Sequence, residues 1–413
     1  MLDNRVAMKW LAGFVVGTAL LGAAANAQPL EVRVDASLAH RILGIVCSGE
    51  PVDREWFRAS PVVGAQIEHH TELSSTRDLD ALLRGLEAAS RCEVPEDDPF
   101  RFASVVRNKA GFEQAVAFLE RHAPDIEQFV VRSVTPFVPA DLEWSGSIVL
   151  SIVGNPCGGF GTKGRFFLAL NCLVADPESD YSAVRVVSAH EVYHALQDAF
   201  FHPRDGEFDD VASFEAALSQ LFWWLETEGT AEYVGDSRQI EGSGVLSGFL
   251  GGFARDGYGR IPLYLRFLGY AADILAAADD YRERLRDVYE LGFSGTGRQV
   301  FYYAGAAMTA HLDRTYGREA LVCILGLPAE EFVLAYQATA LDSPGEDSIP
   351  LGRTLVQGAE RLRDSRPPGS ATFHACLQQV RAGRMGQENR EGEGAWRKRS
   401  ESWSSAAPAE PGA

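Results

Sequence analysis

The stretch Ser188-Ala-His-Glu-Val-Tyr-His-Ala-Leu-Gln-Asp198 decides how this sequence is interpreted. We predict a helix over residues 181–202, and His190 and His194 stand four apart within it. Residues four apart on a helix project from one face a turn apart, so both imidazoles can reach a single zinc ion. Glu191 lies one residue round the helix, where it suits a general base better than a ligand. The alternative is a pair of solvated histidines on an ordinary helix.

A reactive zinc ion needs a third protein ligand. The metzincin arrangement would place a glycine three residues and a histidine six residues after the second histidine. Those positions hold Gln197 and Phe200, so that arrangement is excluded.

A second predicted helix, over residues 210–235, supplies a carboxylate. Its apolar residues follow 4, 3, 4 spacing, which predicts a buried stripe made of Phe214, Leu218, Leu221 and Leu225. The same spacing continues into Glu228 and Glu232. A buried carboxylate needs a cation or strong donors, so we predict Glu228 as the third ligand. We expect Glu232 to accept a hydrogen bond from the far ring nitrogen of a ligating histidine, and Glu226 to be solvated on another face. The alternative is a helix end at which both striped glutamates are solvated.

The motif "HEVYH", followed by "WWLETEGTAEY", resembles the gluzincin zinc metallopeptidases. The resemblance implies that His190 and His194 are zinc ligands, that Glu191 is the catalytic base and that Glu228 is the third ligand. It spans roughly residues 146–316 and is closest to poorly characterised exported zinc-dependent peptidases. The spacing between His194 and Glu228 is longer than in the best-known members, which we attribute to an insertion, "HPRDGEFDD".

A later segment, "FYYAGAAMTAHLDRTYG" (301–317), resembles the gluzincin helix in which a tyrosine precedes a glycine and small residues. We predict that Tyr302, or its neighbour Tyr303, donates a hydrogen bond to a developing oxyanion. The small residues 304–307 would let this helix pack close to another. The alternative is that both tyrosines are core aromatics.

The expected fold is α+β and predominantly helical, gluzincin-like, with a small β-sheet before the histidine helix and a helical C-terminal lobe. Strand-like patterns at 146–154 and 164–174 flank a glycine-rich segment, which we interpret as a hairpin loop. This segment matches G-x-G-x-x-G, but a strand pattern follows it where a dinucleotide site needs a helix. Further helices are predicted over 76–90, 111–123, 261–286, 298–316, 317–325 and 328–340.

The chain is predicted to divide into a signal peptide (1–27), an N-terminal α/β lobe (28–180), a helical catalytic lobe (181–384) and a disordered tail (385–413). The first segment has two basic residues, an apolar run and Ala25-Asn26-Ala27 as an A-x-A cleavage site. We therefore expect a periplasmic or secreted protein with no stable membrane span after cleavage. The alternative is an uncleaved anchor.

Six cysteines fit an oxidising compartment. Sequence proximity favours the pairs Cys47–Cys92, Cys157–Cys172 and Cys323–Cys376, and the alternative is that several are buried free thiols. No C-x-x-C spacing occurs, so a thiolate zinc site is not indicated.

The formal net charge of −19 argues against nucleic-acid binding. We predict a zinc-dependent hydrolase acting on a peptide or protein substrate, with Zn²⁺ as its cofactor. The alternatives are a non-catalytic exported binding protein and a zinc hydrolase of non-peptide amides or esters. Three other polar sites are not expected to provide metal ligands. His69 and His70 form a surface-like pair, and His311 lies on a helix surface or in the core. Asp198 is solvated or lies behind the ligands.

Overall fold

The computed structural model describes residues 30–140, 142–154, 157–200, 211–293, 299–342, 345 and 348–382. The predicted signal peptide, C-terminal tail and insertion after the histidine helix lie outside the described residues. The division into lobes at residues 180 and 181 stays a prediction. The fold is α+β and predominantly helical, as expected. Among the described residues, no helix is both long enough and apolar enough to cross a membrane.

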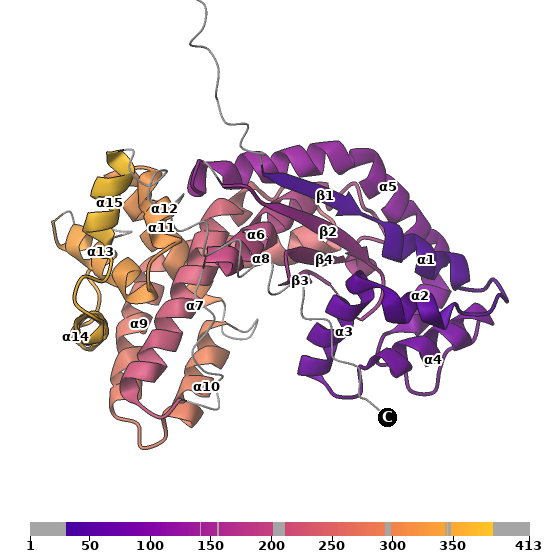
Figure 1. Cartoon of the computed structure of the whole chain (residues 1–413), viewed down its shortest axis with the longest axis horizontal. Coiled ribbons are helices and arrows are strands. Elements are labelled where there is room, and N and C mark those ends of the chain that lie inside the picture. Colours follow the sequence, from indigo (N-terminus) through magenta and orange to yellow (C-terminus); the bar gives the residue numbers. More distant parts are fainter. Residues whose placement is uncertain are drawn as a thin grey trace, which may run out of the picture.

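A four-stranded mixed sheet lies in the middle of the molecule (Figure 1). Its order is β1-β2-β4-β3, and the strands are β1 (Glu31–Asp35), β2 (Ser145–Ser151), β3 (Gly159–Thr162) and β4 (Arg165–Ala169). Strands β1 and β4 both pair in parallel with β2, while β3 pairs antiparallel with β4 and forms an outer edge.

The prediction that the two strand-like patterns form a hairpin with each other is wrong. The two strand-like patterns became β2 and β4, which are parallel neighbours and so cannot be joined by a tight turn. The hairpin lies instead between β3 and β4, because the glycine-rich segment itself becomes β3. Its turn uses Lys163 and Gly164, both at positive φ (50° and 72°), a conformation that glycine adopts at little cost.

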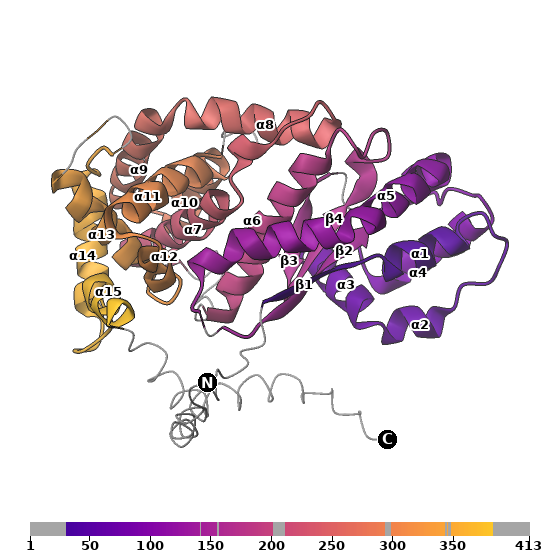
Figure 2. The same cartoon turned by 90° about the horizontal axis from the view of Figure 1, so that it is seen from above.

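Five helices lie between β1 and β2. Two parallel strands cannot be joined by a tight turn, so a long crossover connection is needed, and these helices supply it. They are α1 (Ser37–Ile45), α2 (Arg54–Ala59), α3 (Pro61–Leu73), α4 (Leu79–Ser90) and α5 (Phe102–Val134), followed by the 3₁₀ turn η1 (Thr135–Phe137). Side chains of Asp53, Ser60 and Asp78 accept backbone N–H groups at the starts of α2, α3 and α4, as helix caps do. Helix α4 confirms the helix predicted over 76–90, and α5 contains the one predicted over 111–123. Figure 2 shows α5 crossing over the strands.

The rest of the described chain is helical. After the 3₁₀ turn η2 (Leu170–Cys172) come α6 (Tyr181–Phe200), α7 (Phe214–Val234), the 3₁₀ turn η4 (Ser237–Gln239), α8 (Val245–Tyr258), α9 (Ile261–Ala276), α10 (Tyr281–Gly292), α11 (Val300–Tyr316), α12 (Glu319–Ile324), α13 (Ala329–Asp342), α14 (Arg353–Ser365) and α15 (Phe373–Arg381). The single helix predicted over 261–286 is two, because Asp280 caps a new helix by accepting from the N–H of Glu283 (3.0 Å). Helices α8, α14 and α15 were not predicted.

Helices α7 and α11 pack unusually close. A methyl group on Gly305 would lie 2.2 Å from the carbonyl oxygen of Leu225 and 2.6 Å from Cα of Gly229. Only glycine tolerates so close an approach of two backbones. The expectation that the small residues after Tyr303 permit tight packing is confirmed.

Three disulfides brace the described chain, and all three predicted pairings are confirmed: Cys47–Cys92, Cys157–Cys172 and Cys323–Cys376. The first joins the ends of α1 and α4, the second spans the β3–β4 hairpin and the third ties α12 to α15. Such bonds are compatible with an extracytoplasmic protein.

Candidate metal centre

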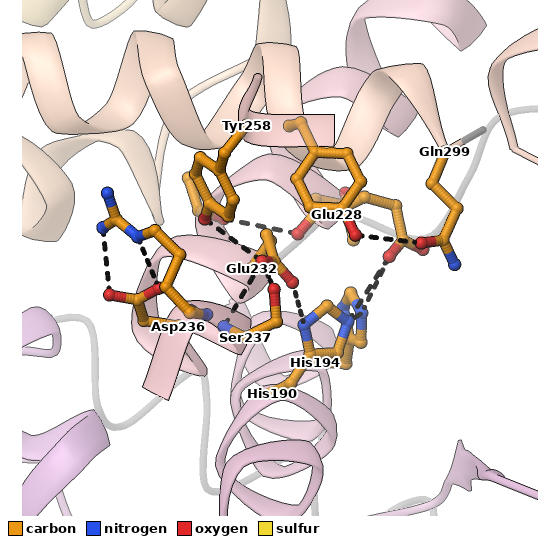
Figure 3. Close-up of polar contacts among 12 residues, drawn as sticks. His190, His194, Glu228, Glu232, Asp236, Ser237, Tyr258 and Gln299 are labelled. Carbon is orange, nitrogen blue, oxygen red and sulfur yellow. Dashed lines mark hydrogen bonds and ion pairs between the residues drawn. The ribbon is translucent and has the colours of Figure 1, made fainter. Parts of the chain in front are cut away.

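Two histidine side chains on helix α6 face one another. His190 and His194 lie one turn apart, their ring centroids are 4.7 Å apart, and their Nε2 atoms face one another at 3.0 Å. Both side chains are largely buried. Figure 3 shows them beside Glu228 and Glu232. The predicted common face of the two histidines is therefore present.

Helix α7 adds a carboxylate at the same point. Oε2 of Glu228 lies 3.5 Å from Nε2 of His190 and 3.3 Å from Nε2 of His194. Two ligands on a tetrahedral zinc ion, with bonds of about 2.0–2.1 Å, are about 3.3 Å apart, so the three separations fit one ion. No other set of three His, Cys, Asp or Glu ligand atoms converges in this way among the described residues.

The electrostatics of the three side chains favour a cation between them. Burial works to raise the pKa of Glu228, but the imidazoles of His194 and His190 outweigh it and lower the pKa to about 2. Burial lowers the pKa of His194, but the carboxylates of Glu228 and Glu191 outweigh it and raise the pKa to about 9. Oε2 of Glu228 is buried without a hydrogen-bond donor, which makes it costly unless positive charge lies beside it. The buried His-His-Glu site is consistent with Zn²⁺.

Each histidine is supported from behind. Nδ1 of His194 lies 2.7 Å from Oε1 of Gln197, whose amide nitrogen donates to the carbonyl of Thr227 (3.0 Å) and the hydroxyl of Thr230 (2.7 Å). Because Oε1 of an amide can only accept, Nδ1 carries the proton and Nε2 is free to ligate. The sequence offered Gln197 only as a mismatch to the metzincin pattern.

The first histidine faces a second glutamate. Oε2 of Glu232, one turn after Glu228 on α7, lies 4.0 Å from Nδ1 of His190. The carboxylate faces the far ring nitrogen as expected, but the predicted hydrogen bond is not formed at this separation. Glu232 is only 5% exposed, so the alternative of a solvated helix end is wrong for both striped glutamates.

Glu191 sits between the ligands and the edge of the sheet. Burial raises its pKa, while the two imidazoles oppose that shift. A methyl group on Gly161 in β3 would lie 3.7 Å from Oε2 of Glu191, so this carboxylate borders the backbone of the edge strand. It is not one of the three converging ligand atoms.

The two candidate tyrosines point to different places. The ring of Tyr302 stacks on His190 with centroids 5.8 Å apart. Burial raises the pKa of Tyr302, and the carboxylates of Glu228 and Glu191 raise it further. The hydroxyl of Tyr303 instead donates to Oε1 of Gln299 (3.2 Å).

The burial of four other polar residues differs in part from the expectations drawn from the sequence. Glu226 is not solvated but 1% exposed, and neither of its carboxylate oxygens has a donor among the described residues. His70 is fully buried against the rings of Phe100 and Phe160, so it is no surface residue. His311 belongs to the core, and Asp198 is exposed.

Comparison with known proteins adds one match. No curated protein and no solved structure shows significant similarity to the chain. A sequence model of the family described as "Putative zinc dependent peptidase (DUF5700)" matches residues 55–344, which is more than two thirds of the chain and includes the whole His-His-Glu site. The chain therefore belongs to this family.

Proposed function

We propose that the protein is a zinc-dependent peptidase in which His190, His194 and Glu228 hold Zn²⁺. The observation that carries the proposal is the convergence of two Nε2 atoms and one carboxylate oxygen at separations of 3.0–3.5 Å. When bound, zinc would polarise a scissile carbonyl and lower the pKa of a bound water, so that this water can lose a proton and act as the nucleophile.

In this proposal Glu191 is the general base. Its carboxylate takes a proton from the attacking water and passes it to the leaving amine. Two features support the role: Glu191 is not one of the ligands, and its carboxylate lies beside the backbone of Gly161 in β3, an edge strand of the sheet.

Tyr302 is the proposed oxyanion donor. Its hydroxyl remains protonated at neutral pH because burial and nearby carboxylates raise its pKa, so it can donate a hydrogen bond to developing negative charge. Tyr303 is the weaker candidate because its hydroxyl donates to Gln299, whereas the hydroxyl of Tyr302 bonds to the proposed ligand Glu228 itself.

We propose that the substrate backbone pairs with β3. Strands β2 and β4 lie inside the sheet, so neither can be the substrate edge. The N–H of Ala169 donates to the carbonyl of Gly158 (2.8 Å), and bonded pairs alternate along an antiparallel ladder. Gly159 and Gly161 therefore turn their N–H and C=O groups away from β4, toward an added strand.

The deciding experiment is Glu191→Gln, which keeps the shape of the side chain and removes its basicity. We expect one zinc per chain by elemental analysis, as in the wild type, and a rate of peptide-library cleavage lower by about 10²–10⁴-fold. Glu72→Gln, an exposed change on α3, is the control and should leave both quantities unchanged. Wild-type cleavage by the Glu191 variant would refute the base, and cleavage that persists after chelation would refute the zinc chemistry.

Export is a further part of the proposal. The predicted leader at 1–27 and the three disulfides support a periplasmic or secreted location. Mass spectrometry of the extracytoplasmic fraction should find a mature chain that begins at Gln28, and an intact leader on a cytosolic chain would contradict export.

A further inference from the structure

Glu232 is held in an asymmetric way. Its Oε1 accepts hydrogen bonds from the hydroxyl of Ser237, from the N–H of Ser237 (3.4 Å) and from the hydroxyl of Tyr258 (3.1 Å). These donors occupy one carboxylate oxygen and leave Oε2 facing Nδ1 of His190 (Figure 3).

The two residues that supply the donors come from different elements. Ser237 begins η4, just after α7, and Tyr258 is the last residue of α8. The guanidinium of Arg238 lies 4.5 Å from the centroid of the Tyr258 ring, and the ring of Tyr303 packs edge-on against Tyr258 at 5.1 Å. Arg238 is itself fixed by paired hydrogen bonds to Asp236 (2.8 and 2.9 Å). The ring contacts keep the Tyr258 hydroxyl aimed at Glu232.

We propose that Tyr258 and Ser237 are positioning residues of the metal centre, which fix Glu232 so that its free oxygen orients the imidazole of His190. At 4.0 Å the carboxylate of Glu232 acts on His190 through its charge rather than through a hydrogen bond. A negative charge that faces Nδ1 favours the proton on that nitrogen, which keeps the Nε2 lone pair for a metal and makes Nε2 a better ligand. Without the two hydroxyl donors, Glu232 keeps only the long bond from the N–H of Ser237 (3.4 Å), so the carboxylate is held less firmly and the ring loses its fixed direction. The inference rests on the metal centre of the proposed function and does not depend on peptide hydrolysis.

The test measures zinc affinity rather than catalysis. Tyr258→Phe keeps the ring and its contacts and removes only the hydroxyl, while Ser237→Ala removes the other hydroxyl. Tyr336→Phe is a matched control, because its hydroxyl donates a hydrogen bond of the same length (3.1 Å) to the carbonyl of Ile349, and Tyr336 lies on α13, which carries none of the proposed ligands. Zinc dissociation constants come from competition with a chromophoric chelator, and visible spectra of the Co²⁺-loaded proteins report ligand geometry.

We expect zinc binding about tenfold weaker for each single variant and up to about 100-fold weaker for the double variant, with an altered Co²⁺ spectrum. The Tyr336 variant should bind zinc as the wild type does. Wild-type affinity and spectrum in both single variants would overturn the inference and leave the peptidase proposal standing. A wild-type chain that binds no zinc would overturn both.

Discussion

The close contact of α7 and α11 gives a prediction that can be worked through from the structure. Alanine at position 305 would bring its methyl carbon to 2.2 Å from the carbonyl oxygen of Leu225 and 2.6 Å from Cα of Gly229. Both neighbours are backbone atoms, which cannot rotate away. Since non-bonded atoms settle at about 3.5–4.0 Å, Gly305→Ala has to push the helices apart by about 1 Å or more.

Two effects of different size follow from this separation. Alanine favours a helix over glycine by about 1 kcal/mol, but an overpacked core costs about 1–3 kcal/mol, so we expect a net loss of stability. Glu228 lies on α7 and Tyr302 on α11, so the metal and the proposed oxyanion donor also move apart. A misplacement of about 1 Å in an active site costs on the order of 100-fold in rate. Zinc content should hold, because all three ligands lie on α6 and α7.

The assay combines urea unfolding, zinc content and peptide cleavage. Gly248→Ala on α8 is the matched control, since a methyl group there meets nothing within 4 Å and the site is exposed. The control should be as stable as the wild type or up to about 1 kcal/mol more stable. A Gly305 variant with wild-type stability and an unchanged cleavage rate would refute the argument that this contact sets the spacing of the two helices.

Two further predictions concern other histidines and their partners. Gln197→Leu removes the acceptor of His194 Nδ1, so zinc affinity measured by chelator competition should fall about 10–100-fold. The control Gln337→Leu loses a bond of equal length (2.7 Å), from the N–H of Leu351, on a helix without ligands, and should leave zinc affinity unchanged. Equal affinity in the two variants would contradict the role of Gln197. His70 provides a pH test: burial lowers its pKa to about 4, against about 6.5 when unfolded, so its stabilising effect is complete above about pH 6.5 and is lost as pH falls toward 4. Urea unfolding at pH 7 and pH 5 should show a smaller drop in stability for His70→Phe than for the wild type, and equal drops would be evidence against a neutral buried imidazole.

The centre of the site was predictable because local spacing determines it. The four-residue spacing of the two histidines and the apolar stripe that ends in Glu228 are properties of single helices, and helical geometry determines the directions of these side chains. The disulfide pairs were also accessible, because cysteines near in sequence were near in space. The relation between the two helices was inferred from the need for a third zinc ligand and a buried carboxylate, and the family resemblance agreed with it.

Errors arose where one helix is enclosed by several others. Helix α7 contacts α6, α9, α11, α13 and α14, so it has no solvated face for Glu226, which a single-stripe pattern had assigned to water. Burial raises the pKa of Glu226 well above its usual range, and the nearby Glu330 on α13 adds to that shift. The sequence of α7 carries no information about how many neighbours surround it.

The supports behind the ligands were missed for a related reason. Tyr258 ends a helix rich in glycine, "VLSGFLGGFARDGY", and glycine weakens the helical signal. Its contact with Glu232 joins residues 26 apart across a turn and a second helix. Such a contact depends on tertiary packing, which periodicity does not encode.

The exposed border of the sheet has a consequence for handling the protein. An unpaired strand is a template on which a second copy of the chain can extend the sheet, and this leads to aggregation. Strand β3 limits that risk because it is only four residues long, contains two glycines and is followed by the charged Lys163, which pairs with Glu68. A concentrated sample should therefore stay monodisperse unless residues 159–162 are replaced by longer β-branched side chains, which would favour self-association over turnover.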